Sequence, residues 1–331
     1  MTDPGTVLLT GPTRNLGRHT VLAMADRPAA RRPDLLLVGR AGADLTAVAD
    51  EARARGARVH EIGCDLSRLA DVRAAATTAR DLLAAGTVRP LRALVANAGV
   101  MSSDTRRASA DGYETTFAVN FLAHAQLIGD LRGSLTHPAR VVLLGSNTYH
   151  ANVWRRLLHV PAAEWADPVE LARPAAVDGG MTASGIAYSN AKLAILYYAH
   201  ELQRRVGDGI AVSVFEPGWM PGTALGRGAP AAVQAISRAL DRVPGVSTPR
   251  RSGPLLAAVA LDDEWAHLRD GAFVVKSTMT EVQPIAHDRA RERRLWEATA
   301  ELLDGAGLRP RPGGADPGAV GGHRGAADPT G

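Results

Sequence analysis

The sequence of 331 residues contains little cysteine, little lysine and no long apolar run. Its single cysteine, Cys64, excludes an internal disulfide and a cysteine-rich metal site, and such a composition is typical of a reducing compartment. No uninterrupted apolar run is long enough to cross a bilayer, and the N-terminus lacks the pattern of a signal peptide. The sequence therefore predicts a cytoplasmic globular protein.

Charge gives little indication of a macromolecular partner. The chain has 38 basic and 34 acidic residues, a net charge of +4, and only Lys192 and Lys276 are lysine. The pI of about 9.6 mostly reflects arginine, and no basic run is interleaved with aromatics, so we expect no nucleic-acid partner. We also expect no metal, because metal-ligand spacing and acidic or cysteine neighbours are lacking around His124, His150, His159 and His200.

Short apolar runs alternate with longer helical patterns along most of the chain. Most runs lack polar alternation, as expected of strands buried on both faces of a parallel sheet. The predicted strands are 6–10, 34–40, 58–66, 92–99, 140–146, 210–218 and 271–276. The predicted helices are 17–27, 42–56, 67–86, 111–135, 186–206, 250–263 and 286–305. This alternation predicts an α/β fold with a doubly wound parallel sheet, a Rossmann fold, in a single domain over 1–306.

Three segments depart from this rhythm. Residues 147–187 form an unusually long insertion, and 220–249 form a substrate-side lid with Pro and Gly at both ends. Residues 307–331 are rich in Gly and Pro, and we expect them to be disordered. Three tryptophans lie in or next to the first two segments: Trp154, Trp165 and Trp219. They either border the opening of the substrate site or pack the segments onto the rest of the fold.

A glycine turn, "LLTGPTRNLGRHTVL", links the first strand to the first helix. Such a turn lets the backbone approach a dinucleotide pyrophosphate at the helix N-terminus. The alternative is that the segment is an ordinary loop between a strand and a helix. Asn15 stands where a middle glycine is expected, and asparagine tolerates positive φ better than most residues. The turn predicts cofactor contacts from Thr10, Gly11, Arg14, Asn15, Leu16 and Gly17.

Two arginines indicate which dinucleotide binds. Arg40 ends the second strand, where an acidic residue would pair with the ribose 2′-hydroxyl of NAD, and Asp44 comes only later. Arg14 lies in the turn itself. Two converging guanidinium groups suit a 2′-phosphate, so the sequence favours NADPH over NADH, unless both are ordinary surface arginines.

Five features follow one another along the chain: the glycine turn, "ANAG" at 96–99, Asn120, Ser146 and "YSNAK" at 188–192. Short-chain dehydrogenases/reductases have these features in the same order. The chain resembles this family over about residues 5–305. The insertion and the phrases "DGYETTFAVNFLAH" and "EPGWMPGTAL" look most like its retinol-dehydrogenase-like and protochlorophyllide-reductase-like branch.

The resemblance implies a catalytic set. Tyr188 and Lys192 stand four residues apart, so they share one helix face, and the ammonium charge favours the phenolate. By resemblance, Tyr188 is the general acid, Lys192 tunes it and holds the nicotinamide ribose, and Ser146 orients the substrate oxygen. Asn120 matches the asparagine whose backbone and side chain organise a water chain to the lysine.

Further cofactor contacts are also implied by resemblance. Asp65 matches an adenine contact, and Thr223 a contact to the carboxamide or pyrophosphate, one residue later than the commonest spacing. The whole additional set is Asp65, Leu66, Asn97, Ala98, Gly99, Pro217, Gly218 and Thr223.

The expected function is NADPH-dependent hydride transfer to or from a carbonyl or alcohol of a hydrophobic small molecule, with secondary metabolism as one setting. Reduction of a C=C or C=N bond is one alternative, although a substrate-pocket cysteine expected for protochlorophyllide-type chemistry is missing. A non-catalytic NADPH sensor is the other, and it would not need Ser146, Tyr188 and Lys192 together. The chain is expected to be a monomer or a homodimer.

Overall fold

The computed structural model describes residues 4–151, 161–218, 220 and 247–305. Its core is one eight-stranded sheet in the order β3-β2-β1-β4-β5-β6-β7-β8, in which only β8 is antiparallel. This confirms the predicted doubly wound parallel sheet. The strands are β1 Thr6–Thr10, β2 Asp34–Gly39, β3 Val59–Gly63, β4 Leu91–Ala96, β5 Leu135–Leu144, β6 Ile210–Glu216, β7 Ala272–Val275 and β8 Thr278–Thr280.

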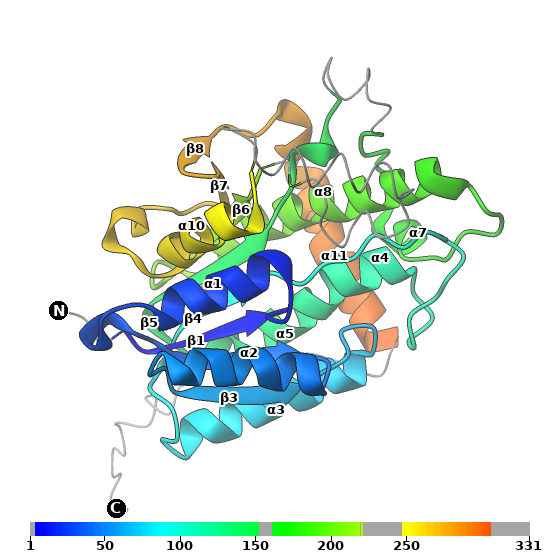
Figure 1. The fold of residues 1–331 in the computed structure, drawn as a ribbon. Coiled ribbons are helices and arrows are strands. Elements are labelled where there is room, and N and C mark those ends of the chain that lie inside the picture. The colour runs from blue at the N-terminus through cyan, green and yellow to red at the C-terminus, as the bar shows by residue number, and fades with distance from the viewer. Residues whose placement is uncertain (1–3, 152–160, 219, 221–246, 306–331) are drawn as a thin grey trace, which may run out of the picture.

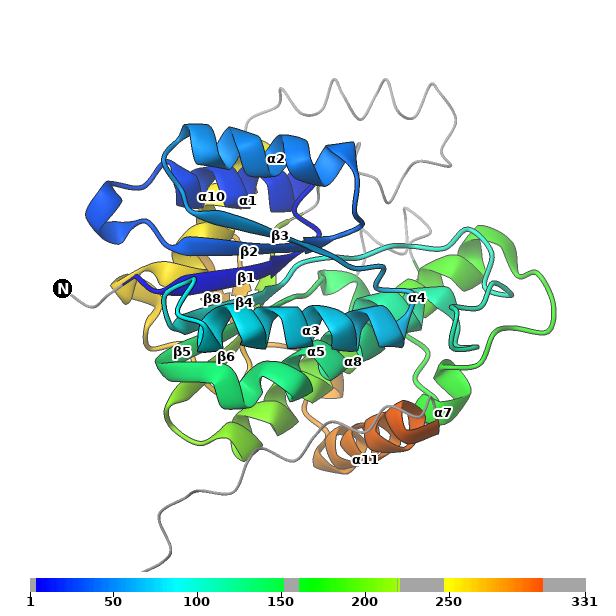
Figure 2. The ribbon, with the colours of Figure 1, turned by 90° about the horizontal axis from the view of Figure 1, so that it is seen from below.

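Helices cover both faces of the sheet (Figures 1 and 2). One face carries α1 (Asn15–Ala25), α2 (Ala43–Ala54) and α10 (Pro249–Leu261). The other carries α3 (Leu69–Ala84), α5 (Ala123–Leu131) and α8 (Gly180–Val206), with α11 (Arg289–Gly305) packed outside α8. Short helices α4 (Thr115–Phe117) and α7 (Pro168–Leu171) lie near the start of α8.

The two helical layers follow from side-chain alternation along buried strands. Successive side chains of a strand point to opposite faces. In β1, Leu8 packs into the core cluster on the α3–α5–α8 side, whereas Val7 and Leu9 pack into the cluster on the α1–α2–α10 side. All three are fully buried, so both faces of β1 need apolar residues, which is why the run shows no polar alternation.

The helix expected over 111–135 is wrong at its start and in its middle. The buried Glu114 carboxylate accepts hydrogen bonds from the backbone N–H groups of Thr116 and Phe117, so it caps a helix that begins only at Thr115. A π-helical segment, η2 (Ala118–Leu122), then interrupts the α-helical hydrogen bonding. A 3₁₀ turn, η3 (Arg132–Ser134), ends the helical region, and β5 begins five residues before the predicted position of 140.

Other boundaries also differ from expectation. Helix α8 begins at Gly180 rather than 186, so the end of the 147–187 insertion is helical. The short exposed strand β8 was not predicted, because "TMT" has no buried face to show in its pattern. Thr223, most of the 220–249 segment, Trp154, Trp219 and the 307–331 tail lie outside the described residues.

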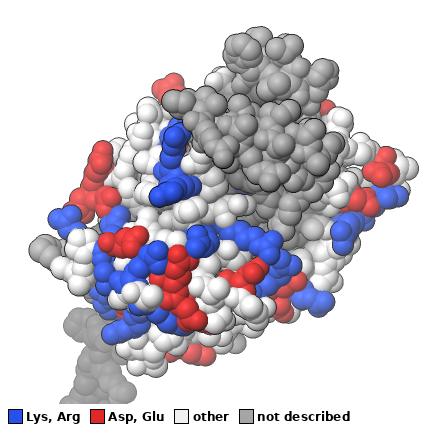
Figure 3. All heavy atoms as spheres, viewed as in Figure 1, with Lys and Arg blue, Asp and Glu red and all other residues white. Residues whose placement is uncertain are grey.

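Basic and acidic side chains are interleaved on the face that carries α1 and α2 (Figure 3). Arg18 pairs with Glu51, and Arg53 pairs with both Asp50 and Glu61. Exposed pairs of this kind contribute little stability individually.

Candidate active site

The predicted site residues gather at the carboxyl edge of the sheet. Strand order reverses between β1 and β4, and ligands of open α/β sheets bind at such a switch point. Thr10 ends β1, Asn97 follows β4, Ser146 follows β5 and Pro217 follows β6. Long helix α8 begins beyond this edge and brings Tyr188 and Lys192 to it (Figure 1).

The glycine turn is tightly packed against the strand ends. Gly11 has φ of +67°, and a Cβ there would lie 2.9 Å from the Cα of Ala98. A Cβ on Gly17 would lie 2.1 Å from the Gly11 carbonyl oxygen, so no larger residue fits. Asn15 has φ of +46°, a conformation that asparagine tolerates. The turn thus replaces the expected middle glycine with a residue that can adopt the same backbone.

The start of α1 is suited to an anion. Its N-cap, Arg14, makes no side-chain capping bond, and no acidic residue lies in its first turn. The first N–H groups of the helix therefore have no side-chain partner in the described residues, and a pyrophosphate would satisfy them. Leu16 is buried and anchors this turn to the core.

Asn97 ties the turn to β4. Its Nδ2 donates to the carbonyl oxygens of Thr10 and Gly11 at 2.9 and 3.1 Å. Its Oδ1 is buried and has no hydrogen-bond partner among the described residues. A buried acceptor without a donor is costly, so this edge fits a bound ligand that carries donors, such as a nicotinamide dinucleotide. Ala98 and Gly99 continue the same lining, with Gly99 packed near the Asn120 side chain.

The residues expected near the adenosine lie beside α2. Arg14 pairs with Asp44 at 2.6 Å, and both side chains are more than half exposed. Arg40 is exposed at the end of β2. Burial opposes ionisation of Asp65, but hydrogen bonds from Ser67 and the charge of Arg40 outweigh it and lower the pKa of the Asp65 carboxyl. Leu66 is buried beneath this region.

Tyr188 and Lys192 meet as their spacing predicts. The Lys192 Nζ lies 5.4 Å from the centre of the Tyr188 ring and donates to the main-chain oxygen of Leu144 at 2.6 Å. Lys192 is only 1% exposed, and burial lowers its pKa to about 7, opposed by the negative charge of Glu216. Tyr188 is half-buried, so part of its side chain stays accessible from outside the protein.

Ser146 and Asn120 flank this pair. Ser146 caps a 3₁₀ turn, η4 (Asn147–Tyr149), where its Oγ accepts from the Thr148 N–H at 3.3 Å and keeps its own proton to donate. Asn120 lies in the π-helical segment. Its side-chain amide accepts from the Val100 N–H at 2.7 Å and donates to the Val100 oxygen at 2.8 Å. The side chain thus holds the loop after β4, and its role in a water chain stays a prediction.

Sequence reasoning missed two charged residues. Glu216 is buried beside Lys192, and its carboxylate accepts from the Gly218 N–H at 3.1 Å. The sequence alone could have indicated Glu216, because an acidic residue at the end of an otherwise apolar strand is rarely buried without a role. The second residue, Lys276, follows β7, and a Cβ on Gly218 would lie 2.6 Å from its Cε. Both lysines of the chain therefore lie at this edge.

Other candidates lie away from the chemistry. The Cys64 thiol is buried, and burial with the nearby Asp71 and Asp65 charges raises its pKa to about 12, so it is not a nucleophile. Trp165 packs edge-on against Tyr197 of α8, which favours the packing interpretation for this tryptophan. In the parts of the chain that the structure describes, no three potential metal ligands come together, and the absence of a metal stays a prediction.

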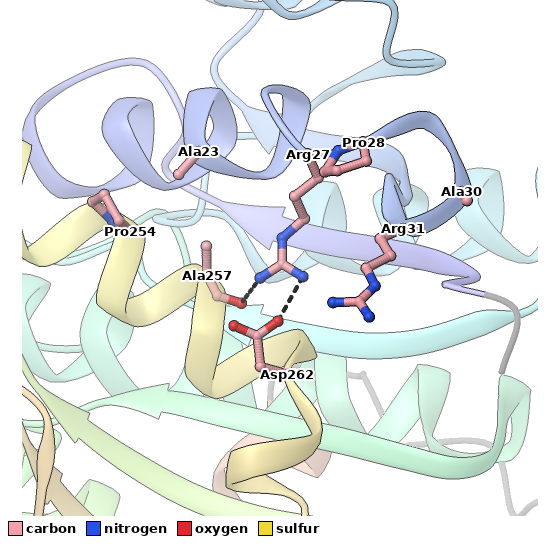
Figure 4. Close-up of a pocket in the computed structure, with 8 residues that line it drawn as sticks. All are labelled: Ala23, Arg27, Pro28, Ala30, Arg31, Pro254, Ala257 and Asp262. Carbon is pink, nitrogen blue, oxygen red and sulfur yellow. Dashed lines mark hydrogen bonds and ion pairs between the residues drawn. The ribbon is translucent and has the colours of Figure 1, made fainter. Parts of the chain in front are cut away.

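A surface hollow of about 440 Å³ lies between the end of α1 and α10 (Figure 4). The Arg27 guanidinium in it pairs with Asp262 at 2.7 Å and donates to the Ala257 oxygen at 3.4 Å. Helix α1 runs antiparallel to the strands, so its end marks the amino edge of the sheet. This hollow is therefore on the opposite side from the candidate site.

Comparison with known proteins identifies the family. Residues 5–153 match the family model described as short chain dehydrogenase. A polyprenol dehydrogenase of Mus musculus is 32% identical over 92% of this chain and 85% of its own. A protein of Streptomyces sp. (strain C5), provisionally named a daunorubicin C-13 ketoreductase, is 30% identical over 91% of this chain and 93% of its own. The match to a probable oxidoreductase of Streptomyces lividans, 31% identical, spans 64% of this chain and 63% of that protein.

Solved structures agree on the fold. A blue fluorescent protein from a metagenomic library, in complex with NADPH, superposes with a TM-score of 0.59 at 22% identity, covering 82% of this chain and 96% of its own. Among the described helices, none is long and apolar enough to span a membrane. Family model, relatives and fold agree: the chain belongs to the short-chain dehydrogenase/reductase family of NAD(P)-dependent oxidoreductases.

Proposed function

We propose that the protein uses NADPH to reduce the carbonyl group of a hydrophobic small molecule. The observation that carries this proposal is the buried Lys192 ammonium beneath the Tyr188 ring, with the donor Ser146 at the end of the neighbouring strand. When bound, the nicotinamide supplies a hydride. Tyr188 gives a proton to the substrate oxygen, and the Ser146 hydroxyl donates a hydrogen bond that orients and polarises it.

Lys192 makes Tyr188 a better acid. An ionised tyrosine is stabilised by a nearby ammonium, so proton donation by the phenol costs less. Glu216 supports this role because its charge favours the protonated lysine, against the burial that lowers its pKa to about 7. The catalytic assignments of Tyr188, Lys192 and Ser146 are part of this proposal, as is that of Asn120.

The cofactor preference rests on Arg40 and Arg14. An exposed pair such as Arg14–Asp44 is weak, so a 2′-phosphate could draw Arg14 away at little cost. Arg40 would hold the same phosphate from the end of β2. The lone buried thiol of Cys64 suits the reducing cytoplasm, where we place the enzyme.

The hydrophobic substrate class is supported by the relatives, whose names point to polyprenol and daunorubicin. The second of these also supports a setting in secondary metabolism. We further propose that the protein is a monomer, because the outer face of α8, through which family members often dimerise, is covered by α11. Trp296 of α11 stacks on Tyr198 of α8 at 5.4 Å.

The test is oxidation of NADPH, with NADH in parallel, against a panel of apolar aldehydes, ketones, enones and imines. Turnover of saturated ketones that is faster with NADPH would support the proposal. Turnover of only the C=C or C=N substrates would replace it with the alternative chemistry. NADPH binding without turnover of any class would favour a sensor.

A further inference from the structure

His124, which the mechanism above does not use, is buried between the cofactor turn and the π-helical segment. It is 2% exposed, and Thr10 beside it is fully buried. The His124 Nε2 lies 2.9 Å from the Thr10 Oγ1, and its Nδ1 lies 3.1 Å from the Asn120 main-chain oxygen. One imidazole therefore joins the end of β1 to the segment that holds Asn120.

The direction of each hydrogen bond can be assigned. The Thr10 Oγ1 accepts from the backbone N–H groups of Asn97 and Ala98, both at 3.0 Å. A hydroxyl has two lone pairs and one proton, so the Thr10 proton must go to the His124 Nε2. The imidazole then carries its own proton on Nδ1 and donates it to the Asn120 oxygen.

This assignment requires a neutral ring. A second proton on Nε2 would face the Thr10 hydroxyl proton and break the contact. Burial lowers the His124 pKa to about 4; the Asn120 hydrogen bond opposes this, and the positive charge of Lys192 adds to it. Geometry and electrostatics thus agree that His124 stays uncharged and keeps the same tautomer.

The π-helical segment explains why such a bridge is useful. Its altered hydrogen bonding turns carbonyl groups out of the regular helical ladder, and segments of this kind are frequent at functional sites. The segment packs against α8, the helix that carries Lys192. The His124 ring adds a side-chain donor to the Asn120 main-chain carbonyl, and a donor held in one place helps to fix the orientation of that carbonyl.

We propose that His124 is a positioning residue: a permanently neutral bridge that fixes the Asn120 carbonyl relative to the cofactor turn. This inference rests on the proposed function. The bridge gives the Asn120 carbonyl a fixed donor while adding no charge beside the ammonium. It also couples the two sides of the site, so that loosening one should disturb the other.

The first arm of the test is ¹⁵N NMR of the imidazole in the full chain. We expect a neutral Nδ1–H tautomer for His124 whose shifts stay constant across about pH 5.5 to 8.5. An Nε2–H tautomer, or titration within this range, would overturn the bridge whatever the enzyme reduces.

The second arm is turnover by His124→Phe, which keeps an aromatic ring, and by His124→Gln, which keeps one donor and one acceptor. We expect kcat to fall about 10- to 100-fold in His124→Phe, with NADPH binding within a few-fold of wild type, and to recover in part in His124→Gln. His200→Phe is the matched control, because His200 is also buried and hydrogen-bonded but at the far end of α8.

Each outcome has a distinct meaning. Unchanged kcat in His124→Phe, or an equal loss in His200→Phe, overturns the positioning role while the proposed function stands. A loss in His124→Phe that tracks only a loss of folded protein, with no recovery in His124→Gln, also overturns it. A wild type without carbonyl turnover overturns the proposed function itself, and the role of His124 with it.

Discussion

The ammonium of Lys192 lies 5.4 Å from the centre of the Tyr188 ring, and the residue is only 1% exposed. A chain with 36 arginines among its 38 basic residues places one of its two lysines here. A guanidinium is wide and planar, whereas an ammonium is compact and can lose its proton. The buried position under the tyrosine therefore selects lysine.

Lys192→Arg tests this selection. The Nζ donates to the Leu144 oxygen at 2.6 Å in a buried space, which leaves no room for the guanidinium fork. We expect kcat to fall about 100-fold or more because Tyr188 loses its correctly placed charge. Steady-state turnover measures this, with circular dichroism to verify folding. An arginine variant with nearly full kcat would contradict the account.

Burial of Lys192 should also make stability depend on pH. The pKa of the lysine falls from 10.5 to about 7 on folding, so between these values the unfolded chain binds more protons. The free energy of unfolding should then rise with pH in this window, by at most about 1.4 kcal/mol per pH unit from this group.

Lys192→Met removes that contribution. The stability of wild type relative to Lys192→Met should therefore increase as the pH is raised from about 7 towards 10. Urea unfolding of both proteins at several pH values measures the difference. A difference that stays constant, or that changes in the opposite direction, would show that the lysine is not held at a lowered pKa.

Arg40 and Asp44 offer opposite tests of cofactor choice. Arg40→Ala should weaken NADPH binding about 10-fold or more, because a charge-assisted bond to the 2′-phosphate is lost, and leave NADH nearly unaffected. Asp44→Asn should tighten NADPH binding, since it frees Arg14 from its partner. Titration of tryptophan fluorescence with each cofactor gives the affinities of the wild type and of both variants. An equal loss of affinity for NADPH and NADH in Arg40→Ala would show that Arg40 does not recognise the 2′-phosphate.

The packing of α11 on α8 predicts a monomer. Besides the Trp296–Tyr198 stack, the Arg205 guanidinium lies 4.6 Å from the Trp296 ring, and the Glu292 carboxylate bonds to His200 at 3.0 Å. Light scattering should give about 34.7 kDa. Trp296→Ala should cost about 2 kcal/mol of unfolding free energy through lost apolar contact. A wild type of twice this mass would mean that dimers form despite α11, or through another surface.

The sheet could be predicted from the sequence because its central strands, such as β1 and β6, are mostly apolar and buried on both faces. Features that depend on tertiary contacts could not be predicted in this way. The π-helical segment around Asn120 has no local sequence signature, and the early start of α8 at Gly180 includes two glycines, Thr182 and Ser184, which are weak helix formers.

The candidate site shows the same division. Family motifs supplied Tyr188, Lys192, Ser146 and the glycine turn, and the structure brings them to one edge of the sheet. The roles of Glu216 and His124 depend on neighbours more than 20 residues away in sequence, Lys192 and Thr10. The sequence presents His124 only as one of four histidines without metal-ligand spacing, because spacing alone does not reveal a hydrogen-bond bridge.

The central claim is hydride transfer to a carbonyl carbon with Tyr188 as the proton donor. It is tested most directly by incubating a ketone substrate with NADPH that carries deuterium at both C4 positions and determining deuterium in the alcohol by mass spectrometry. The account predicts one deuterium at the carbinol carbon with wild type, and a rate about 100-fold or more lower with Tyr188→Phe despite retained cofactor binding. Product without deuterium, or equal rates in the two proteins, would contradict it.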